Sequence, residues 1–255
     1  MKILISNDDG LETPGIQALA KAVKRFGEVY VVAPHRERST TSHSLTLHKP
    51  VRILPAGDNQ FATTGTPADC IYLGIREIIG DKPDLILSGI NAGANLGTDV
   101  HYSGTVAAAR EGALMNIPSY AFSMVSMAGD DRKFRFEMGA DLAATLLEKT
   151  LSLKFPDHSI LNVNIPNIEK TAIKGFRVSR QGFRYYAHEV VKRTDPRGKD
   201  YYWIGGPYIG FEKSDVSDCH AVEERYVSVT PLTLDSTQVR FKEQLDGAGI
   251  NELRV

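Results

Sequence analysis

The hydrophobic pattern opens with an apolar run at residues 3–5 (Ile-Leu-Ile), followed at once by Ser-Asn-Asp-Asp-Gly. A short apolar run that stops at turn-forming residues is typical of a buried strand entering a loop. Residues 14–26 carry apolar side chains at helical spacing, between Thr13, a good N-cap, and Gly27, a good helix end. A second apolar run at residues 29–34 completes a strand–helix–strand unit, whose two strands we expect to be parallel.

Strand and helix patterns continue to alternate up to about residue 168. The predicted strands cover residues 84–91, 119–125 and 160–166, and the predicted helices cover residues 67–78, 104–114 and 134–151. Two extended segments, residues 45–54 and 61–64, are expected to form an inserted hairpin. Alternation of this kind predicts an α/β fold with a mainly parallel sheet.

The pattern changes after about residue 168. Residues 176–209 mix aromatic and charged side chains with Gly and Pro and have little helical periodicity, which indicates β-hairpins or an arm. Residues 226–231 read as a strand again, and residues 236–245 as a last helix. We therefore divide the chain into a core, residues 1–168, and a C-terminal region, residues 169–255, of extended arm, hairpins and a closing strand and helix.

Composition narrows the class of protein. The 255 residues are 42% hydrophobic, enough for a large core, and the formal net charge of -1 argues against binding a nucleic-acid polymer by bulk electrostatics. The sequence has no apolar run long enough to span a bilayer and no signal-peptide pattern at its start. Cys70 and Cys219 form no CxxC motif, as in a protein with reduced thiols. We expect a cytoplasmic protein with neither a membrane nor a nucleic-acid polymer as partner.

Two adjacent carboxylates, Asp8 and Asp9, follow the first strand, at the edge where open α/β sheets bind ligands. Neighbouring side chains point to opposite faces of a strand, so both can face one site only if the backbone turns. Asn7 and Gly10 favour such a turn. Two carboxylates held close repel each other, and a cation would remove that cost. The alternative is an ordinary Asp-Asp-Gly turn with two solvated charges.

Oxygen-bearing side chains also follow the second and third main strands, as Ser39 and Asn91. Carboxylate, hydroxyl and amide oxygens suit a hard cation, so Mg²⁺ or Mn²⁺ fits better than Zn²⁺. His35, His43 and His101 lie in the same loops and would favour zinc. None of them has the spacing of a zinc site, so we interpret each as an ordinary loop histidine.

The segment Ser103–Gly104–Thr105 stands at the start of the predicted helix over residues 104–114. Free backbone N–H groups and the helix dipole attract an anion there, and a glycine lets a ligand approach closely. By itself, Ser103 could be no more than an N-cap. Next to a cation site at the neighbouring strand ends, the segment indicates an anion-binding site.

Taken in order, these motifs resemble the SurE family, the stationary-phase survival proteins that act as 5′/3′-nucleotidases. The resemblance rests on residues 6–10 (SNDDG), 14–16 (PGI), 32–34 (VAP), 38–39 (RS), 65–70 (GTPADC), 88–91 (SGIN), 102–106 (YSGTV), 195–198 (DPRG) and 226–231 (YVSVTP). Each motif alone is weak, but the ordered set spans nearly the whole chain.

This resemblance implies a Rossmann-like three-layer core, a swapped C-terminal arm and a homodimer or homotetramer. It implies a phosphomonoesterase with one divalent cation per subunit, Mg²⁺ or Mn²⁺. The implied substrates are nucleoside 5′-monophosphates, with 3′-monophosphates and short polyphosphate as further candidates. By matching position, the metal ligands are Asp8, Asp9, Ser39 and Asn91, with Asp8 and Asp9 also catalytic, and the phosphate-binding residues are Asn95, Ser103, Gly104 and Thr105.

Two other functions stay open at this point. One is a non-catalytic nucleotide-sensing module on the same fold, because fold alone does not give function. The other is a metal-dependent nucleotide-sugar transferase, for which the sequence shows no DxD motif. Release of phosphate from a nucleoside monophosphate separates these hypotheses.

The sequence also allows predictions about the reaction mechanism and about the assembly of subunits. Gly10 stands where an aspartyl-phosphate enzyme would carry its second acid, so we expect direct attack by a cation-activated water. The aromatic arm lacks a core of its own, so we expect Tyr201, Tyr202 or Trp203 to be buried against another subunit. The alternative is an arm that folds back on its own core.

Overall fold

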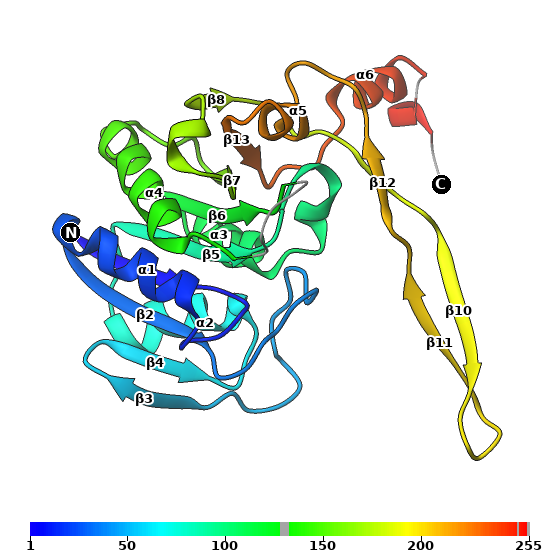
Figure 1. Cartoon of the computed structure of the whole chain (residues 1–255). Helices are drawn as coiled ribbons and strands as arrows, with labels where there is room; N and C mark the ends of the chain where they lie inside the picture. Colours follow the sequence, from blue (N-terminus) through cyan, green and yellow to red (C-terminus); the bar gives the residue numbers. More distant parts are fainter. Residues whose placement is uncertain (128–132, 249, 254–255) are drawn as a thin grey trace.

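A nine-stranded, mainly parallel sheet forms the centre of the computed structural model, which describes residues 1–127, 133–248 and 250–253 (Figure 1). The strand order is β3-β4-β2-β1-β5-β6-β7-β13-β8. Its strands are β1 (Lys2–Ser6), β2 (Glu28–Pro34), β3 (Ile53–Gly57), β4 (Gln60–Thr63), β5 (Leu85–Ala92), β6 (Ser119–Val125), β7 (Ser159–Pro166), β8 (Phe176–Val178) and β13 (Val227–Thr233). The predicted α/β class with a mainly parallel sheet is confirmed.

Helices cover both faces of this sheet (Figure 1). Helices α1 (Pro14–Val23) and α4 (Phe136–Thr150) pack on one face, and α2 (Pro67–Leu73) and α3 (Gly104–Leu114) on the other. In β1, Ile3 and Ile5 join the core on the α1 side, whereas Leu4 joins the core on the α2 side. Because successive strand residues face opposite layers, a strand buried on both sides has to be apolar throughout. This makes β1 a rigid base for the loop that follows it.

The topology brings two loops to one place. The chain leaves β1 through α1 and returns in β2 on one side, while β5 pairs with β1 on the other side, and both neighbours run parallel to β1. The carboxyl ends of β1 and β5 therefore flank the point where the strand order reverses. In open α/β sheets, ligands bind in the crevice at that point.

The start of α2 is capped by side chains that also fix a loop. Thr66 and Asp69 form both halves of a capping box. Asp69 is 5% exposed and accepts hydrogen bonds from the backbone and the hydroxyl of Thr46 at 2.8 and 2.6 Å. The predicted hairpin is confirmed for β3 and β4, but the strand starts at Ile53, so the preceding residues form a loop instead.

Residues beyond 168 divide between the sheet and an arm. Strands β8 and β13 extend the sheet, with β13 antiparallel to β7 and α5 (Asp218–Glu223) packed on β13. The arm consists of two strand pairs, β9 (Arg184–Tyr186) with β12 (Tyr208–Phe211) and β10 (Glu189–Thr194) with β11 (Asp200–Gly205). The remaining elements are α6 (Val239–Gly247), η1 (Lys24–Phe26), η2 (Gly74–Ile79), η3 (Gly97–His101), η4 (Lys170–Ala172) and η5 (Ile250–Glu252).

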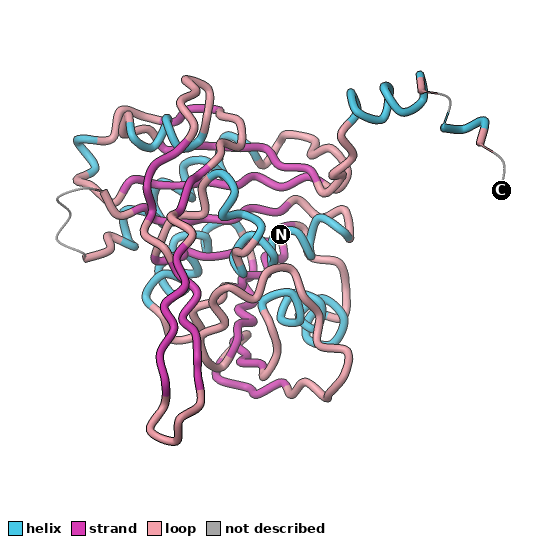
Figure 2. The backbone as a smooth tube through the Cα atoms, turned by 90° about the vertical axis from the view of Figure 1, so that its right-hand side faces the viewer, coloured by secondary structure: helices cyan, strands magenta, loops and turns pink. Residues whose placement is uncertain are grey.

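The β10–β11 hairpin projects away from the body in both views, and α6 lies apart from the sheet (Figures 1 and 2). This hairpin carries large apolar side chains that are exposed to solvent: Tyr202, Trp203 and Ile204 are 57%, 64% and 91% exposed. The β10–β11 hairpin therefore does not fold back on its own core in this structure. No helix among the described residues is long and apolar enough to cross a membrane.

Candidate functional site

A cavity of ≈ 1000 Å³ opens at the carboxyl ends of β1 and β5. Loops that lie far apart in the sequence supply its walls, as the topology requires. Among the residues predicted for the site, Asp8, Asp9, Ser39, Asn91, Asn95 and Ser103 line this cavity. Gly104 and Thr105 lie directly behind that wall, against Asp8.

The loop after β1 turns sharply, which lets two neighbouring carboxylates face one cavity. The Asn7 amide accepts a hydrogen bond from the Gly10 N–H at 3.1 Å and donates to the Gly10 carbonyl at 3.0 Å. The same amide donates to the Thr13 hydroxyl at 2.9 Å. Gly10 has a φ of 115°, a conformation that strongly favours glycine. The predicted turn is therefore present, and the buried Asn7 side chain holds it.

Asp8 is a buried carboxylate, only 5% exposed. Its Oδ1 accepts a hydrogen bond of 2.5 Å from the Thr105 hydroxyl, and its carbonyl accepts one of 2.7 Å from the Arg38 N–H. Burial raises the pKa of Asp8, and the Thr105 hydrogen bond opposes that rise. Without a counter-charge, the ionised form of Asp8 is thus unfavourable here.

Asp9 shares this electrostatic problem. Burial, followed by repulsion from Asp8, raises the pKa of Asp9 to about 6, although a hydrogen bond with the Ala92 backbone opposes the shift. Glu37, a third carboxylate on the cavity wall, adds repulsion to both. Glu37 was not among the predicted site residues, because the residues next to it in the loop after β2 do not indicate that it lies close to Asp8 and Asp9.

A bulge at the end of β5 sets the position of Asn91. The register of β5 against β6 shifts between Ser88 and Asn91, and such an extra residue redirects the side chains that follow it. The Asn91 amide nitrogen donates to the Gly93 carbonyl at 3.0 Å, which leaves the amide oxygen for a ligand. Ser39 is exposed and donates to Glu37 at 2.5 Å.

These donors fit a hard divalent cation. Two carboxylates whose pKa values are raised by burial and repulsion form a site that lacks positive charge. Among residues 1–127, 133–248 and 250–253, no group of three or more His, Cys, Asp or Glu side chains is arranged to hold a metal. A cation here would therefore bind two carboxylates and neutral oxygens, which suits Mg²⁺ or Mn²⁺ better than Zn²⁺.

The N-terminus of α3 meets Asp8 directly. Ser103 is its N-cap, and the Ser103 hydroxyl accepts the Val106 N–H at 3.0 Å. A Cβ on Gly104 would lie 2.7 Å from the Asp8 Cβ, so a residue with a side chain does not fit there. The first N–H groups of a helix have no partner within the helix, and Gly104, the first residue of α3, packs against Asp8. Thr105 is fully buried, and its hydroxyl serves Asp8 rather than the cavity that was predicted for it.

Asn95 is anchored by three residues of β6 and β7. Its N–H donates to the Asn164 side chain at 2.9 Å, and its carbonyl accepts from Asn162 and Asn164 at 2.8 and 3.0 Å. Its side-chain nitrogen donates to the Ser123 hydroxyl at 2.8 Å. An amide nitrogen carries two protons, so one remains for a ligand in the cavity.

The root of the arm, residues 183–186, supplies another part of the cavity wall. From the sequence, this segment was predicted to be only part of an arm. Arg184 forms a salt bridge with Asp99 of η3, and the Tyr186 hydroxyl donates to both oxygens of Asp99 at 2.9 and 2.8 Å. Burial and the hydrogen bond to Asp99 raise the pKa of Tyr186 to about 12, so this hydroxyl stays protonated. The alternation of aromatic residues around Arg184 was the signal available in the sequence.

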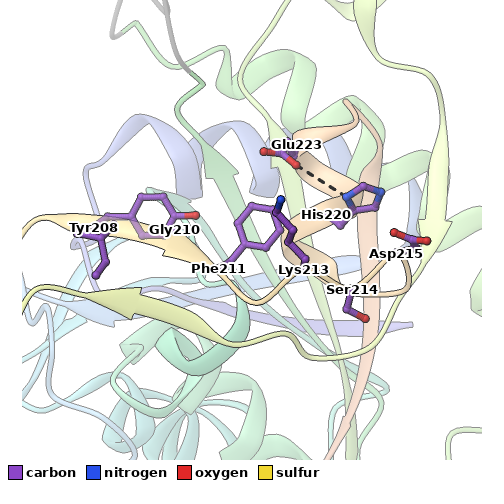
Figure 3. A pocket seen from close by; sticks show the side chains of 9 residues that line it. Tyr208, Gly210, Phe211, Lys213, Ser214, Asp215, His220 and Glu223 are labelled. Carbon is purple, nitrogen blue, oxygen red and sulfur yellow. Dashed lines mark ion pairs between the residues drawn. The ribbon is translucent and has the colours of Figure 1, made fainter.

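A second hollow, of ≈ 650 Å³, lies between β12 and α5 (Figure 3). Tyr208 and Phe211 line it from β12, and His220 and Glu223 line it from α5, with 3.8 Å between His220 Nδ1 and Glu223 Oε2. It contains none of the predicted site residues. The predicted carboxylates and the N-terminus of α3 meet at the β1–β5 cavity.

The chain is similar to known proteins over most of its length. Residues 3–188 match the family model described as "Survival protein SurE". The chain is 49% identical to the "5'-nucleotidase SurE" of Geotalea daltonii, over 93% of this chain and 94% of that protein. It is 50% identical to the protein of the same name from Myxococcus xanthus, over 92% and 88%. A crystal structure of the SurE protein from Aquifex aeolicus superposes with a TM-score of 0.85 at 43% identity, covering 98% of this chain and 100% of that one.

The hydrogen bond from Thr105 to Asp8 predicts a specific effect of removing that hydroxyl. In Thr105→Val, Asp8 loses its one side-chain donor in a buried site, so its ionised form becomes less favourable. We expect the affinity for Mg²⁺ or Mn²⁺, measured by calorimetry, to fall about 10- to 100-fold. Thr105→Ser keeps the hydroxyl and is expected to bind the metal nearly as wild type does. Equal affinity in wild type and Thr105→Val would contradict this role.

The raised pKa values predict how the metal-free protein responds to pH. Because folding raises the pKa of Asp9 from 3.8 to about 6, the native state binds protons more tightly, and stability falls as the pH rises between these values. Asp9→Asn removes this loss. After allowance for solvent screening, we expect its free energy of unfolding in chelator to exceed that of wild type by about 1–2 kcal/mol at pH 7, with no gain at pH 4.

Denaturant unfolding at the two pH values measures this difference. Asp81→Asn is the matched control, because Asp81 is an exposed acid whose only ion pair, to Lys2, spans 3.7 Å between exposed side chains. Added Mg²⁺ should stabilise wild type more than Asp9→Asn. If Asp9→Asn were less stable than wild type at pH 7 in chelator, the carboxylates would not be in conflict.

Proposed function

This chain belongs to the SurE family, and on that premise we propose that it is a 5′-nucleotidase that hydrolyses nucleoside 5′-monophosphates in the β1–β5 cavity. One observation carries the assignment of the site. The buried carboxylate of Asp8, which adjoins Asp9, lies directly against the N-terminus of an 11-residue helix, with Gly104 as the point of contact. A phosphate ester needs both groups, because its oxygens can bind a cation on one side and backbone N–H groups on the other.

We infer that one divalent cation binds per subunit and that it is Mg²⁺ or Mn²⁺. Its proposed ligands are the oxygen atoms of Asp8, Asp9, Ser39 and Asn91. When bound, the cation supplies positive charge that lowers the pKa of water and offsets charge on the phosphate. Support comes from the donor set, since hydroxyl and amide oxygens join the two carboxylates on one cavity wall.

The phosphate is assigned to the start of α3. The N–H groups of Gly104 and Thr105, with the helix dipole, face the group that becomes more negative during the reaction. The spare proton of the Asn95 amide is a further donor to the phosphate oxygens. Ser103 lines the cavity while it caps the helix, so its role is to fix the first turn.

For the chemical step, we infer a single in-line displacement by water. The attacking water forms a P–O bond and gives up a proton while the bond from phosphorus to the 5′ oxygen breaks, and the 5′ oxygen takes up a proton from solvent water so that the nucleoside leaves as an alcohol. Asp8 and Asp9 hold the cation through their oxygens, so neither is well placed to attack phosphorus. Of the two, Asp9 is more exposed and is the better acceptor of the water's proton.

The two parts of the chain are assigned different tasks. Residues 1–168 carry all the proposed metal and phosphate ligands. Residues 169–255 contribute the arm, whose Tyr202, Trp203 and Ile204 need cover. We infer a homodimer or homotetramer in which the arm packs on a neighbouring subunit. The hairpin's distance from its own body supports this assembly (Figures 1 and 2).

An assay of phosphate release tests the activity. We expect release from nucleoside 5′-monophosphates with Mg²⁺ or Mn²⁺ and none in excess chelator, with 3′-monophosphates and short polyphosphate tested in parallel. Asp8→Asn should lower kcat/KM at least about 1000-fold, because the site loses the charge that holds the cation. Asp81→Asn, an exposed acid far from the cavity, is the control that should keep full activity.

Each alternative function has its own result in that assay. A sensing module would bind the nucleotide without releasing phosphate, and a transferase would need an acceptor. Full activity of Asp8→Asn would overturn the metal site. An ester that is chiral at phosphorus should give inversion, as one displacement by water requires, whereas net retention would indicate a phosphoenzyme.

Light scattering tests the assembly. We expect wild type at micromolar concentration to have a mass that is a multiple of 28.0 kDa. The double variant Trp203→Asp, Ile204→Asp should form smaller species, because charges replace apolar side chains in the contact. Lys199→Ala, at the tip of the same hairpin, is the control that should leave the mass unchanged. A monomeric wild type would rule out the exchanged arm.

A further inference from the structure

Part of the cavity wall is aromatic and has no ligand assigned to it. Phe183 and Tyr185, at the root of the arm, line the same cavity as Asp8 and Asp9. Their rings lie 5.3 Å apart with 46° between the planes, and the two residues are 48% and 43% exposed. Exposed aromatic faces inside a cavity suit a planar, weakly polar ligand group, which can stack on them.

The backbone that carries Tyr185 is fixed on both sides. Before it, Arg184 pairs with Asp99, and the side chains of this pair are only 14% and 18% exposed. After it, the Tyr186 hydroxyl bonds to the same carboxylate. The Thr98 hydroxyl also donates to the Arg184 carbonyl at 3.3 Å. A ring on a backbone held in this way loses little freedom when a ligand stacks on it.

The positive charge of Arg184 in this wall is already paired within the protein. Asp99 neutralises the Arg184 guanidinium, which also lies 4.2 Å from the centre of the Tyr208 ring. Arg184 therefore offers no free cation to a phosphate. The phosphate is instead served by the start of α3, which follows η3 and its Asp99 along the chain. The wall is left to recognise an uncharged, flat part of the same substrate.

We propose that Phe183 and Tyr185 form the nucleobase subsite of this cavity, with Asp99 as the residue that positions it. This inference rests on the proposed nucleotidase activity, because it assumes a substrate that joins a phosphate to a planar base. Stacking does not depend on a particular pattern of hydrogen-bond donors and acceptors, so the subsite accepts several bases. Purines, with the larger ring area, should bind more tightly than pyrimidines.

The test compares substrates with and without a base. Wild type, Tyr185→Ala and Tyr185→Phe are assayed with adenosine 5′-monophosphate and with ribose 5-phosphate. We expect Tyr185→Ala to raise KM for the nucleotide about 5- to 100-fold, the usual effect of losing one stacked ring, and to leave ribose 5-phosphate within about twofold. Tyr185→Phe keeps the ring and should behave as wild type does. Asp99→Asn, which weakens the clamp, should raise KM for the nucleotide in the same direction.

Inhibition gives a second readout that does not need a base-free substrate. Adenosine should inhibit wild type in competition with the nucleotide, and Tyr185→Ala should weaken this inhibition without changing inhibition by inorganic phosphate. Three results would overturn the subsite: equal loss on both substrates, no change on either, or no inhibition of wild type by adenosine. A wild type that releases phosphate from neither substrate would instead refute the nucleotidase activity itself. Phe183→Ala repeats the test should Tyr185→Ala fail to fold.

Discussion

Two neighbouring carboxylates, Asp8 and Asp9, are held where burial and mutual repulsion both oppose their ionisation. Keeping such a pair in place requires a stiff support, and the chain provides it by burying β1 on both faces. The Asn7 turn then points both side chains into one cavity. Two further contacts act on this pair, because the Thr105 hydroxyl donates to Asp8 and the Ala92 backbone forms a hydrogen bond with Asp9.

Local features of the chain were enough to predict the core and much of the site. The apolar run before Asp8, and the helix-start residues Thr13 and Ser103, act over a few residues and were confirmed. Asn91 could be placed at a strand end for the same reason. Partners distant in sequence could not be predicted this way. The hydroxyl of Thr105 bonds to the carboxylate of Asp8, 97 residues earlier in the chain. The residues next to Thr105 give no sign of this contact and indicate only a helix start that could bind an anion.

The C-terminal region illustrates a second limit of local patterns. Strand β13 was predicted, but nothing near it indicates that it pairs antiparallel with β7 and so extends the core sheet. Arg184 and Tyr186 looked like part of an exposed arm, because aromatic and charged residues alternate there. Their partner, Asp99, lies more than eighty residues earlier, and only the folded chain brings it to them. Side chains that build a wall between distant segments carry little signal in either segment alone.

The arm and the cavity share one continuous piece of backbone. Strand β9 ends at Tyr186 and β10 begins at Glu189, and the cavity is lined by His188 between them and by Gly205 of β11. A partner that binds the hairpin would therefore contact a segment that also lines the cavity. Thermodynamic linkage makes such an effect reciprocal. If assembly changes the affinity for the ligand by some factor, the ligand changes the affinity between subunits by the same factor. Ligand binding in the cavity and the proposed assembly through the hairpin would therefore be two coupled equilibria.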